Sequence, residues 1–226
     1  MRLTLSLASA VACLALVAGP ALATPVDGDQ TAVDPTQPLL SGVGLSALGS
    51  GSVDGIGRAV LPVTGGDVGI PLVDGYIEHE GSGFALTQGT VSVSFLDLLV
   101  DLDFSRVLGT LVFDPGADPN QVFEDVVLFD ARACLLSTGS DPCTDDDGSI
   151  RLNGFGLDLV GLTADVLNDA FFDGTPSLLE GDILGIADID IRLVPEPGVA
   201  RLALVAAAGL GLALRRRSTP RRLPGA

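Results

Sequence analysis

Four aspartates in one short stretch are the residues best suited to bind a metal ion. Carboxylate oxygens are the ligands that Ca²⁺ prefers, so the stretch predicts a calcium-binding loop. It does not follow the EF-hand frame, because that frame requires acidic residues where Cys143 and Gly154 stand. A solvated acidic turn is the alternative interpretation. The four residues are Asp141, Asp145, Asp146 and Asp147.

The single histidine, His79, limits the catalytic chemistry open to this chain. A Ser-His-Asp mechanism needs a histidine base and an exposed serine, and no G-x-S-x-G sequence occurs. No phosphate-binding glycine pattern occurs either. A glycosidase uses paired carboxylates with stacking aromatics, whereas the chain has no tryptophan and only Tyr76 as tyrosine. We therefore expect a non-catalytic protein, and we interpret His79, between Glu78 and Glu80, as a solvated strand residue.

The first 23 residues are typical of a secretory signal peptide. Arg2 supplies the positive start, and the apolar stretch Leu3–Val17 follows it. Ala21 and Ala23 place small residues at the two positions that a signal peptidase reads, so we expect cleavage after Ala23 and export of residues 24–226. A retained N-terminal anchor is the alternative interpretation.

Export changes the interpretation of the cysteines. After cleavage the chain keeps Cys134 and Cys143, an even pair in an oxidising compartment. The turn-rich residues between them could fold back, and a disulfide there would stabilise the fold by about 2–3 kcal/mol. Two free thiols are the alternative. A zinc site is not expected, because the chain has one histidine and no C-x-x-C spacing.

The C-terminal segment, residues 194–226, has three parts in order. Residues 194–198 read Val-Pro-Glu-Pro-Gly, and the prolines favour an extended backbone because they lack an N–H and fix φ. Residues 199–214 are apolar except for Arg201 and predict a short transmembrane helix, marginal against the roughly 20 residues of a full span. A basic tail, residues 215–226, follows, and its positive charges are expected to stay on the cytoplasmic side of the membrane. Its membrane-stop residues are Arg215, Arg216 and Arg217.

This order of motif, apolar helix and arginine cluster resembles the PEP-CTERM sorting signal of exopolysaccharide-producing Gram-negative bacteria. A membrane protease-transpeptidase called exosortase acts on that signal. The resemblance covers only the C-terminal segment, and its motif residues are Pro195, Glu196 and Pro197. It implies that the inner membrane holds the precursor until exosortase cuts near the motif, and that the product reaches the cell surface or the exopolysaccharide matrix. An anchor that is never processed is the alternative.

The charge of the exported part narrows its partners. Residues 24–194 contain 5 arginines, no lysine and 28 acidic residues, which gives a net charge of −23. A surface this acidic repels nucleic acid and attracts cations. We therefore expect no nucleic-acid partner.

The remaining residues predict a mainly β fold. Residues 24–52 are rich in Pro, Gly, Ser, Thr and Asp and predict an exposed, flexible lead-in with room for one short strand. Residues 53–193 contain short alternating runs and predict an acidic β-rich ectodomain, either an antiparallel β-sandwich or a twisted sheet, with one short helix from an N-cap at Thr163 to a stop at Gly174. The alternation changes phase at Leu96-Asp97, which predicts a β-bulge. The predicted strands are Val91–Phe95, Leu98–Phe104, Val107–Phe113, Val126–Phe129, Ile150–Val160 and Ile183–Leu193.

Two roles for the ectodomain follow from these features. The first is a structural or adhesive surface protein that the C-terminal signal sorts. The second is a calcium- or polymer-binding module that remains anchored in the membrane.

Overall fold

The computed structural model describes residues 24–69, 74–132 and 149–194. The predicted signal peptide, the motif from Pro195 onward, the transmembrane helix and the basic tail lie outside these residues. So do the cysteines and the aspartates of the predicted calcium loop, and all of these remain predictions. Within the described residues, no helix is long and apolar enough to cross a membrane.

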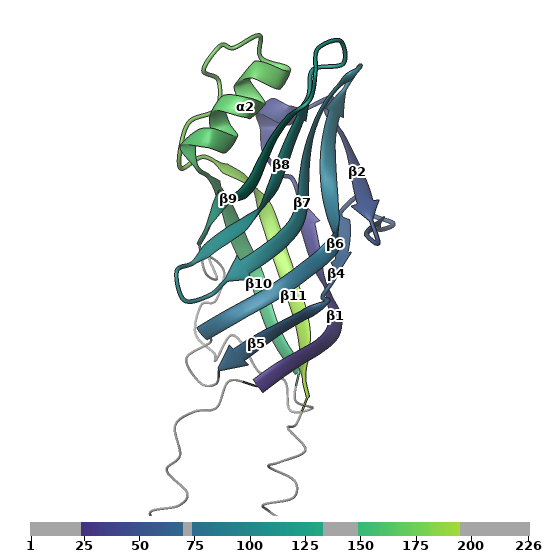
Figure 1. Ribbon diagram of the computed structural model, residues 1–226, viewed down its shortest axis with the longest axis vertical. Helices are drawn as coiled ribbons and strands as arrows, with labels where there is room; N and C mark the ends of the chain where they lie inside the picture. Colours follow the sequence, from purple (N-terminus) through teal and green to yellow (C-terminus); the bar gives the residue numbers. More distant parts are fainter. Residues whose placement is uncertain (1–23, 70–73, 133–148, 195–226) are drawn as a thin grey trace, which may run out of the picture. The chain divides into compact units, whose positions relative to one another are not determined.

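Antiparallel strands make up most of the described chain, with one α-helix and one short 3₁₀ helix (Figure 1). The elements are β1 (Thr24–Asp34), η1 (Pro38–Leu40), β2 (Gly44–Gly49), β3 (Ser52–Val53), β4 (Ala59–Pro62), β5 (Gly65–Gly69), β6 (Asp74–Gln88), β7 (Val91–Asp101), β8 (Arg106–Asp114), β9 (Gln121–Arg132), β10 (Ser149–Leu159), α2 (Gly161–Phe171) and β11 (Ile183–Leu193).

The strands form one curled sheet rather than two stacked sheets. From β5 to β11 each strand pairs with the next, and β2 pairs with the C-terminal half of β6. The sheet closes because β1 pairs with β5 and β4 and also with β11, the other end of the series (Figure 1). Of the two predicted architectures, the twisted antiparallel sheet is therefore the one observed.

The hairpin of β7 and β8 follows directly from local sequence. Residues of β8 are alternately buried and half-buried, as expected for a strand with one face on the core. The predicted bulge is confirmed, because the register of β7 with β8 shifts between Leu96 and Leu99. Asp97 has a φ of 51° there, and its carboxylate accepts a 2.8 Å hydrogen bond from the Gly81 N–H of β6.

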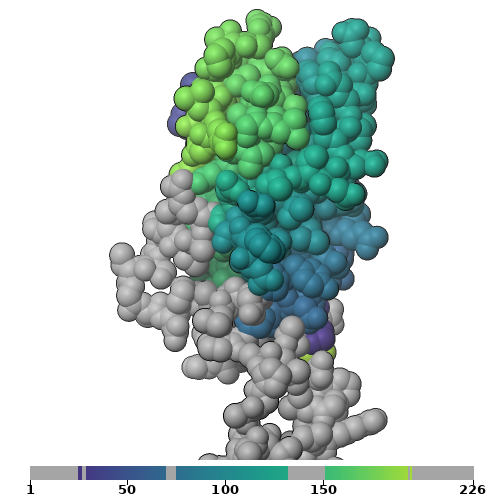
Figure 2. Space-filling view, turned by 60° about the vertical axis from the view of Figure 1, so that its left-hand side comes forward, coloured from purple at the N-terminus to yellow at the C-terminus, as the bar shows by residue number. Residues whose placement is uncertain are grey.

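Helix α2 covers one end of the curled sheet and contacts β7, β8 and β9 (Figure 2). It starts at Gly161, two residues before the predicted N-cap, and Val160 is its actual cap residue. Thr163 lies instead in the first turn, where its hydroxyl donates a 2.7 Å hydrogen bond to the Leu128 carbonyl of β9. The predicted stop is close to the observed end, because Gly174 has a φ of 72° and its N–H bonds to the Asn168 carbonyl.

The expected flexible lead-in, residues 24–52, instead supplies β1 and β2. Val33 of β1 is only 2% exposed and pairs with Ala187 of β11 and Ala59 of β4. The sequence of β1 is polar and contains proline and glycine, but three strands from elsewhere in the chain pair with it. Tertiary pairing overrides weak local strand preference at this position.

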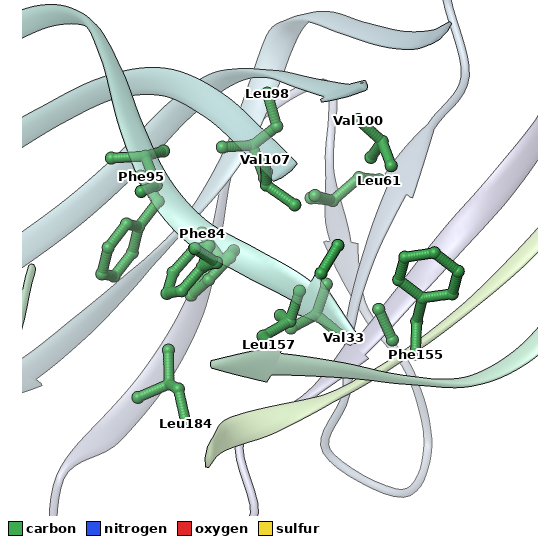
Figure 3. Packing of buried hydrophobic residues seen from close by; sticks show 14 of the residues in the cluster. Val33, Leu61, Phe84, Phe95, Leu98, Val100, Val107, Phe155, Leu157 and Leu184 are labelled. Carbon is green, nitrogen blue, oxygen red and sulfur yellow. The ribbon is translucent and has the colours of Figure 1, made fainter. Parts of the chain in front are cut away.

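A single apolar core fills the inside of the curled sheet (Figure 3). Phe95 stands at its centre, with ring centroids 4.8 Å from Phe84 and 5.2 Å from Phe129. Side chains from strands on opposite sides of the closed sheet point toward one another, among them Val33, Leu61, Val107 and Leu157.

Candidate functional site

Two candidate sites stand out among the described residues: an inner site at His79 and an outer hollow at Tyr76. Both are on β6, where alternate side chains face opposite sides of the sheet. His79 faces inward and is 1% exposed, whereas Tyr76 faces outward and is 39% exposed.

The inner site is a buried histidine held by two other strands. Its Nδ1 lies 3.0 Å from the Pro62 carbonyl of β4, and its Nε2 lies 3.1 Å from the Thr31 hydroxyl of β1. A carbonyl can only accept, so Nδ1–H donates to Pro62 and the neutral ring's Nε2 accepts from Thr31. The prediction of a solvated histidine is therefore wrong. Glu78 and Glu80 face the opposite side of the strand, and that period-two pattern was the available signal.

Burial determines the charge of this imidazole. Removal of the ring from water lowers the pKa of His79 below the ordinary histidine value of about 6.5. The hydrogen bond to the Pro62 carbonyl acts in the opposite direction and is the smaller effect. The folded protein therefore holds His79 in its neutral form near pH 7.

The interior around His79 has almost no free space. Its cavity measures about 20 Å³, enough for roughly one water molecule. Apart from Thr31 and His79, the lining side chains are apolar. This interior is a packed core rather than a ligand pocket.

The outer hollow has a volume of about 330 Å³ and lies on the solvent face of β6 and β7. Tyr76, the chain's single tyrosine, forms part of its wall with three carboxylates. Two of these are oriented by backbone groups: Asp103 accepts from the Gly75 N–H at 2.9 Å, and Asp101 accepts from the Phe104 N–H at 3.1 Å. The third is Glu78, which also borders a neighbouring hollow of about 170 Å³ with Glu80 and Asp97.

The side chains that line the outer hollow are suited to recognition of a polar ligand. An aromatic face packs against the apolar face of a sugar ring, and carboxylates accept hydrogen bonds from hydroxyl or amine groups. Among the described residues, no group of three or more His, Cys, Asp or Glu side chains is arranged to hold a metal ion. Sequence reasoning identified Tyr76 as the lone tyrosine but did not place it beside Asp101 and Asp103, which come from the next strand and its turn.

The sequence-predicted site residues are only partly covered by the structure. A second acidic set, Asp97, Asp101 and Asp103, is expected from the alternation of the sequence to form the polar face of a strand. Asp97 and Asp101 do lie on the outer side of β7, whereas Asp103 lies in the turn that follows it. The other predicted site residues fall outside the described ranges. They are Ala21, Ala23, Cys134, Asp141, Cys143, Asp145, Asp146, Asp147, Pro195, Glu196, Pro197, Arg215, Arg216 and Arg217.

Comparisons with known proteins define the fold alone. No protein-family model matches the chain, and no curated protein matches it. The C-terminal domain of HtaA from Corynebacterium glutamicum has a similar structure, with a TM-score of 0.56, 11% identity, and coverage of 76% of this chain and 99% of that domain.

Two further structures from the same organism are more distant. The N-terminal domain of HtaA has a TM-score of 0.49 and 14% identity, covering 74% of this chain and 99% of that domain. Heme binding protein HtaB has a TM-score of 0.46 and 11% identity, covering 76% of this chain and 96% of that protein. The class supported here is a curled antiparallel sheet with one short helix, like the HtaA C-terminal domain.

Proposed function

We propose that this chain is an exported surface or matrix protein, sorted by its C-terminal signal, with a non-catalytic structural or adhesive β-rich body. One observation carries the proposal: β11 ends at Leu193 and Val194 lies outside any strand, so the last strand of the body is complete two residues before Pro195. A cut near Pro195 therefore removes the C-terminal segment and leaves every described strand intact.

The pairing of β1 with β11 supports this arrangement. Val26 pairs with Leu193, so the first and last strands end beside each other at one end of the sheet. The terminal part of β11 also pairs with β10 on its other side, through Arg192 and Ser149. The body thus keeps its C-terminal strand between two neighbours up to Arg192, and Leu193 still pairs with β1.

A non-catalytic role is supported by the state of the only imidazole. Thr31 and His79 have the atoms of a nucleophile and its base, but they are 3% and 1% exposed. No substrate can reach them in the closed sheet. The acidic outer hollow has no imidazole of its own, because His79 directs its ring inward.

Heme is the ligand named for HtaB, and the described residues of this chain do not fit it. Iron in heme proteins takes His, Cys, Met or Tyr as an axial ligand. Both ring nitrogens of His79 are already bonded inside a cavity with room for one water molecule. Tyr76 lines the same hollow as Glu78, Asp101 and Asp103, whose charge repels the propionates of heme. We therefore derive no role for heme.

The outer hollow supports a second candidate function, binding of a matrix polymer. Tyr76 offers a stacking face, and the carboxylates fit a neutral or amine-bearing polysaccharide better than an anionic one. Tyr76→Ala should weaken binding of exopolysaccharide purified from the host about tenfold, whereas Tyr76→Phe should retain most of it. Ile56→Ala is the matched control, because Ile56 is exposed on a different hairpin. Equal binding by all three variants would rule out this site.

Replacement of the sorting motif tests the main proposal. Substitution of Pro195, Glu196 and Pro197 by alanine removes the extended motif and leaves the apolar run and the arginines in place. We expect the uncut chain to accumulate in the membrane fraction, detected by immunoblot against the body. Replacement of Glu180, an exposed acidic residue of the body, by alanine is the control and should be processed normally. Normal processing of the motif variant would contradict the proposal.

A further inference from the structure

Strand β6 changes its backbone neighbour on one side near residues 79–81. β5 pairs with β6 as far as Glu78, and β2 begins to pair with it at Ser82. On the other side, the register with β7 shifts between His79 and Gly83. Between the pairings with β5 and β2, the regular ladder gives way to single hydrogen bonds: the Ser50 N–H donates to the Gly81 carbonyl, and the Glu80 N–H donates to the Thr64 hydroxyl.

The side chain of His79 lies at this change of neighbours. Nδ1 bonds to Pro62 of β4 and Nε2 bonds to Thr31 of β1, so one imidazole joins three strands. β1 is also the strand that closes the ring, through its pairing with β11. The hydrogen bond with Thr31 thus connects β6 to the closing strand β1, and the bond to Pro62 connects it to β4, where the regular backbone pairing of β6 changes partners.

We propose that His79 is an acid-sensitive clasp, and that charging its imidazole releases β1 and β4 from β6 and opens the sheet at this point. The inference goes beyond the proposed function and does not depend on it. Opening exposes apolar residues that line the interior beside the ring, among them Leu61, Phe84 and Val107.

The surroundings of His79 favour the neutral ring. On the inner side, β1 presents the Thr31 hydroxyl and β4 presents the Pro62 carbonyl, and the other lining residues are apolar. The charged groups among the described residues at this position line the neighbouring hollow of about 170 Å³, and they are Glu78, Glu80 and Asp97. These carboxylates favour a charged imidazole, but burial is the larger effect and lowers the pKa of His79.

The direction of the pH effect follows from that shift. We call the contact of β1 and β4 with β6 at His79 the seam. When the seam opens, the imidazole returns to water and regains an ordinary pKa near 6.5. The open form therefore binds more protons than the closed form between the lowered pKa and 6.5. Stability of the seam is complete above pH 6.5 and falls as the pH decreases below it, with the opening constant rising about tenfold per pH unit.

Hydrogen exchange of the purified full chain between pH 7.5 and 5 tests this directly. After correction for intrinsic exchange rates, β1 and β4 should open about tenfold more per pH unit below 6.5, while α2 serves as the internal reference. His79→Gln keeps a neutral amide at this position and should remove the pH dependence from β1 and β4. If the wild-type seam shows no pH dependence, or if His79→Gln shows the same slope, the proposal is wrong.

A second measurement covers the case in which His79→Gln does not fold. His79 is the only histidine, so its ring carbon and proton signals can be followed by NMR in the wild-type chain without assignment. The signals should titrate below pH 6.5 and together with the opening of β1. Titration at or above 6.5 in a seam that stays closed would overturn the proposal.

Discussion

The β7–β8 hairpin and strand β1 both contribute to the same core, but they pair with strands at very different distances along the chain. β7 and β8 are adjacent in sequence, and Asp101 pairs with Arg106 across a four-residue turn. β1 pairs with β11, where Val33 meets Ala187 more than 150 residues later in the chain. The hairpin is specified by local alternation and turn residues. β1 is specified by strands that come later in the chain, of which β11 is the last.

This difference determines where the sheet is easiest to open. Contacts between distant parts of the chain carry a larger loop-closure cost than contacts within a hairpin. β1 closes the ring, and its link to β6 depends on one imidazole. We therefore expect the hairpin to contribute most of the free energy of unfolding, and the seam at His79 to determine how the opening of the sheet depends on pH.

The largest expected effect is from a charge placed in β1. Val33→Asp buries an unpaired carboxylate in the core between β11 and β4, so cooperative unfolding should be lost in thermal melts followed by circular dichroism. Val122→Asp is the same change on β9 at a side chain that is 53% exposed, and it should alter stability by less than about 0.5 kcal/mol. A normal melt for Val33→Asp would restore the lead-in interpretation of residues 24–52.

A smaller effect is expected at the centre of the hairpin. Phe95→Ala removes the ring that packs between Phe84 and Phe129 and should lower the free energy of unfolding by about 3–5 kcal/mol in urea titration. The variant should still unfold in one cooperative transition, because the backbone pairing of β7 is unchanged. A loss below about 1 kcal/mol would show that this stack is not the centre of the core.

The smallest effect is expected at the seam. Thr31→Val removes the hydroxyl that donates to His79 and leaves a buried ring nitrogen without its partner. The free energy of unfolding should fall by about 1–3 kcal/mol at pH 7.5. Thr110→Val, on the more exposed side of β8, is the control and should change stability by less than about 0.5 kcal/mol. Equal values for the two variants would show that the hydrogen bond to His79 contributes nothing.

The sequence predicted the elements whose signals are local. Alternation located β11 at Ile183–Leu193, and the phase change at Leu96-Asp97 located the bulge. It did not predict β1, because Thr24–Asp34 carries polar residues and glycine that only its distant partners stabilise in a strand. Nor did it predict the inner site, since the contact of His79 with Thr31 and Pro62 joins strands that are not neighbours in sequence.

The outer hollow was not predicted, although the strand face of some of its carboxylates was. Asp97 and Asp101 could be assigned to the polar side of one strand by alternation. Their position beside Tyr76 depends on the register of β6 with β7, in which Tyr76 pairs with Asp101. Register between strands follows from the turn and from burial of the opposite face, which the sequence alone does not determine.

The intact mass of the mature protein, isolated from its own host with and without the exosortase gene, tests the central claim most directly. The account predicts a chain that starts at Thr24 and ends near Pro195–Pro197 when the protease is present, and one that extends to Ala226 when it is absent. Such a product would contain the whole sheet, from β1 to β11, and neither terminal segment. A mature protein that retains Arg215–Arg217 in the presence of the protease would contradict the account.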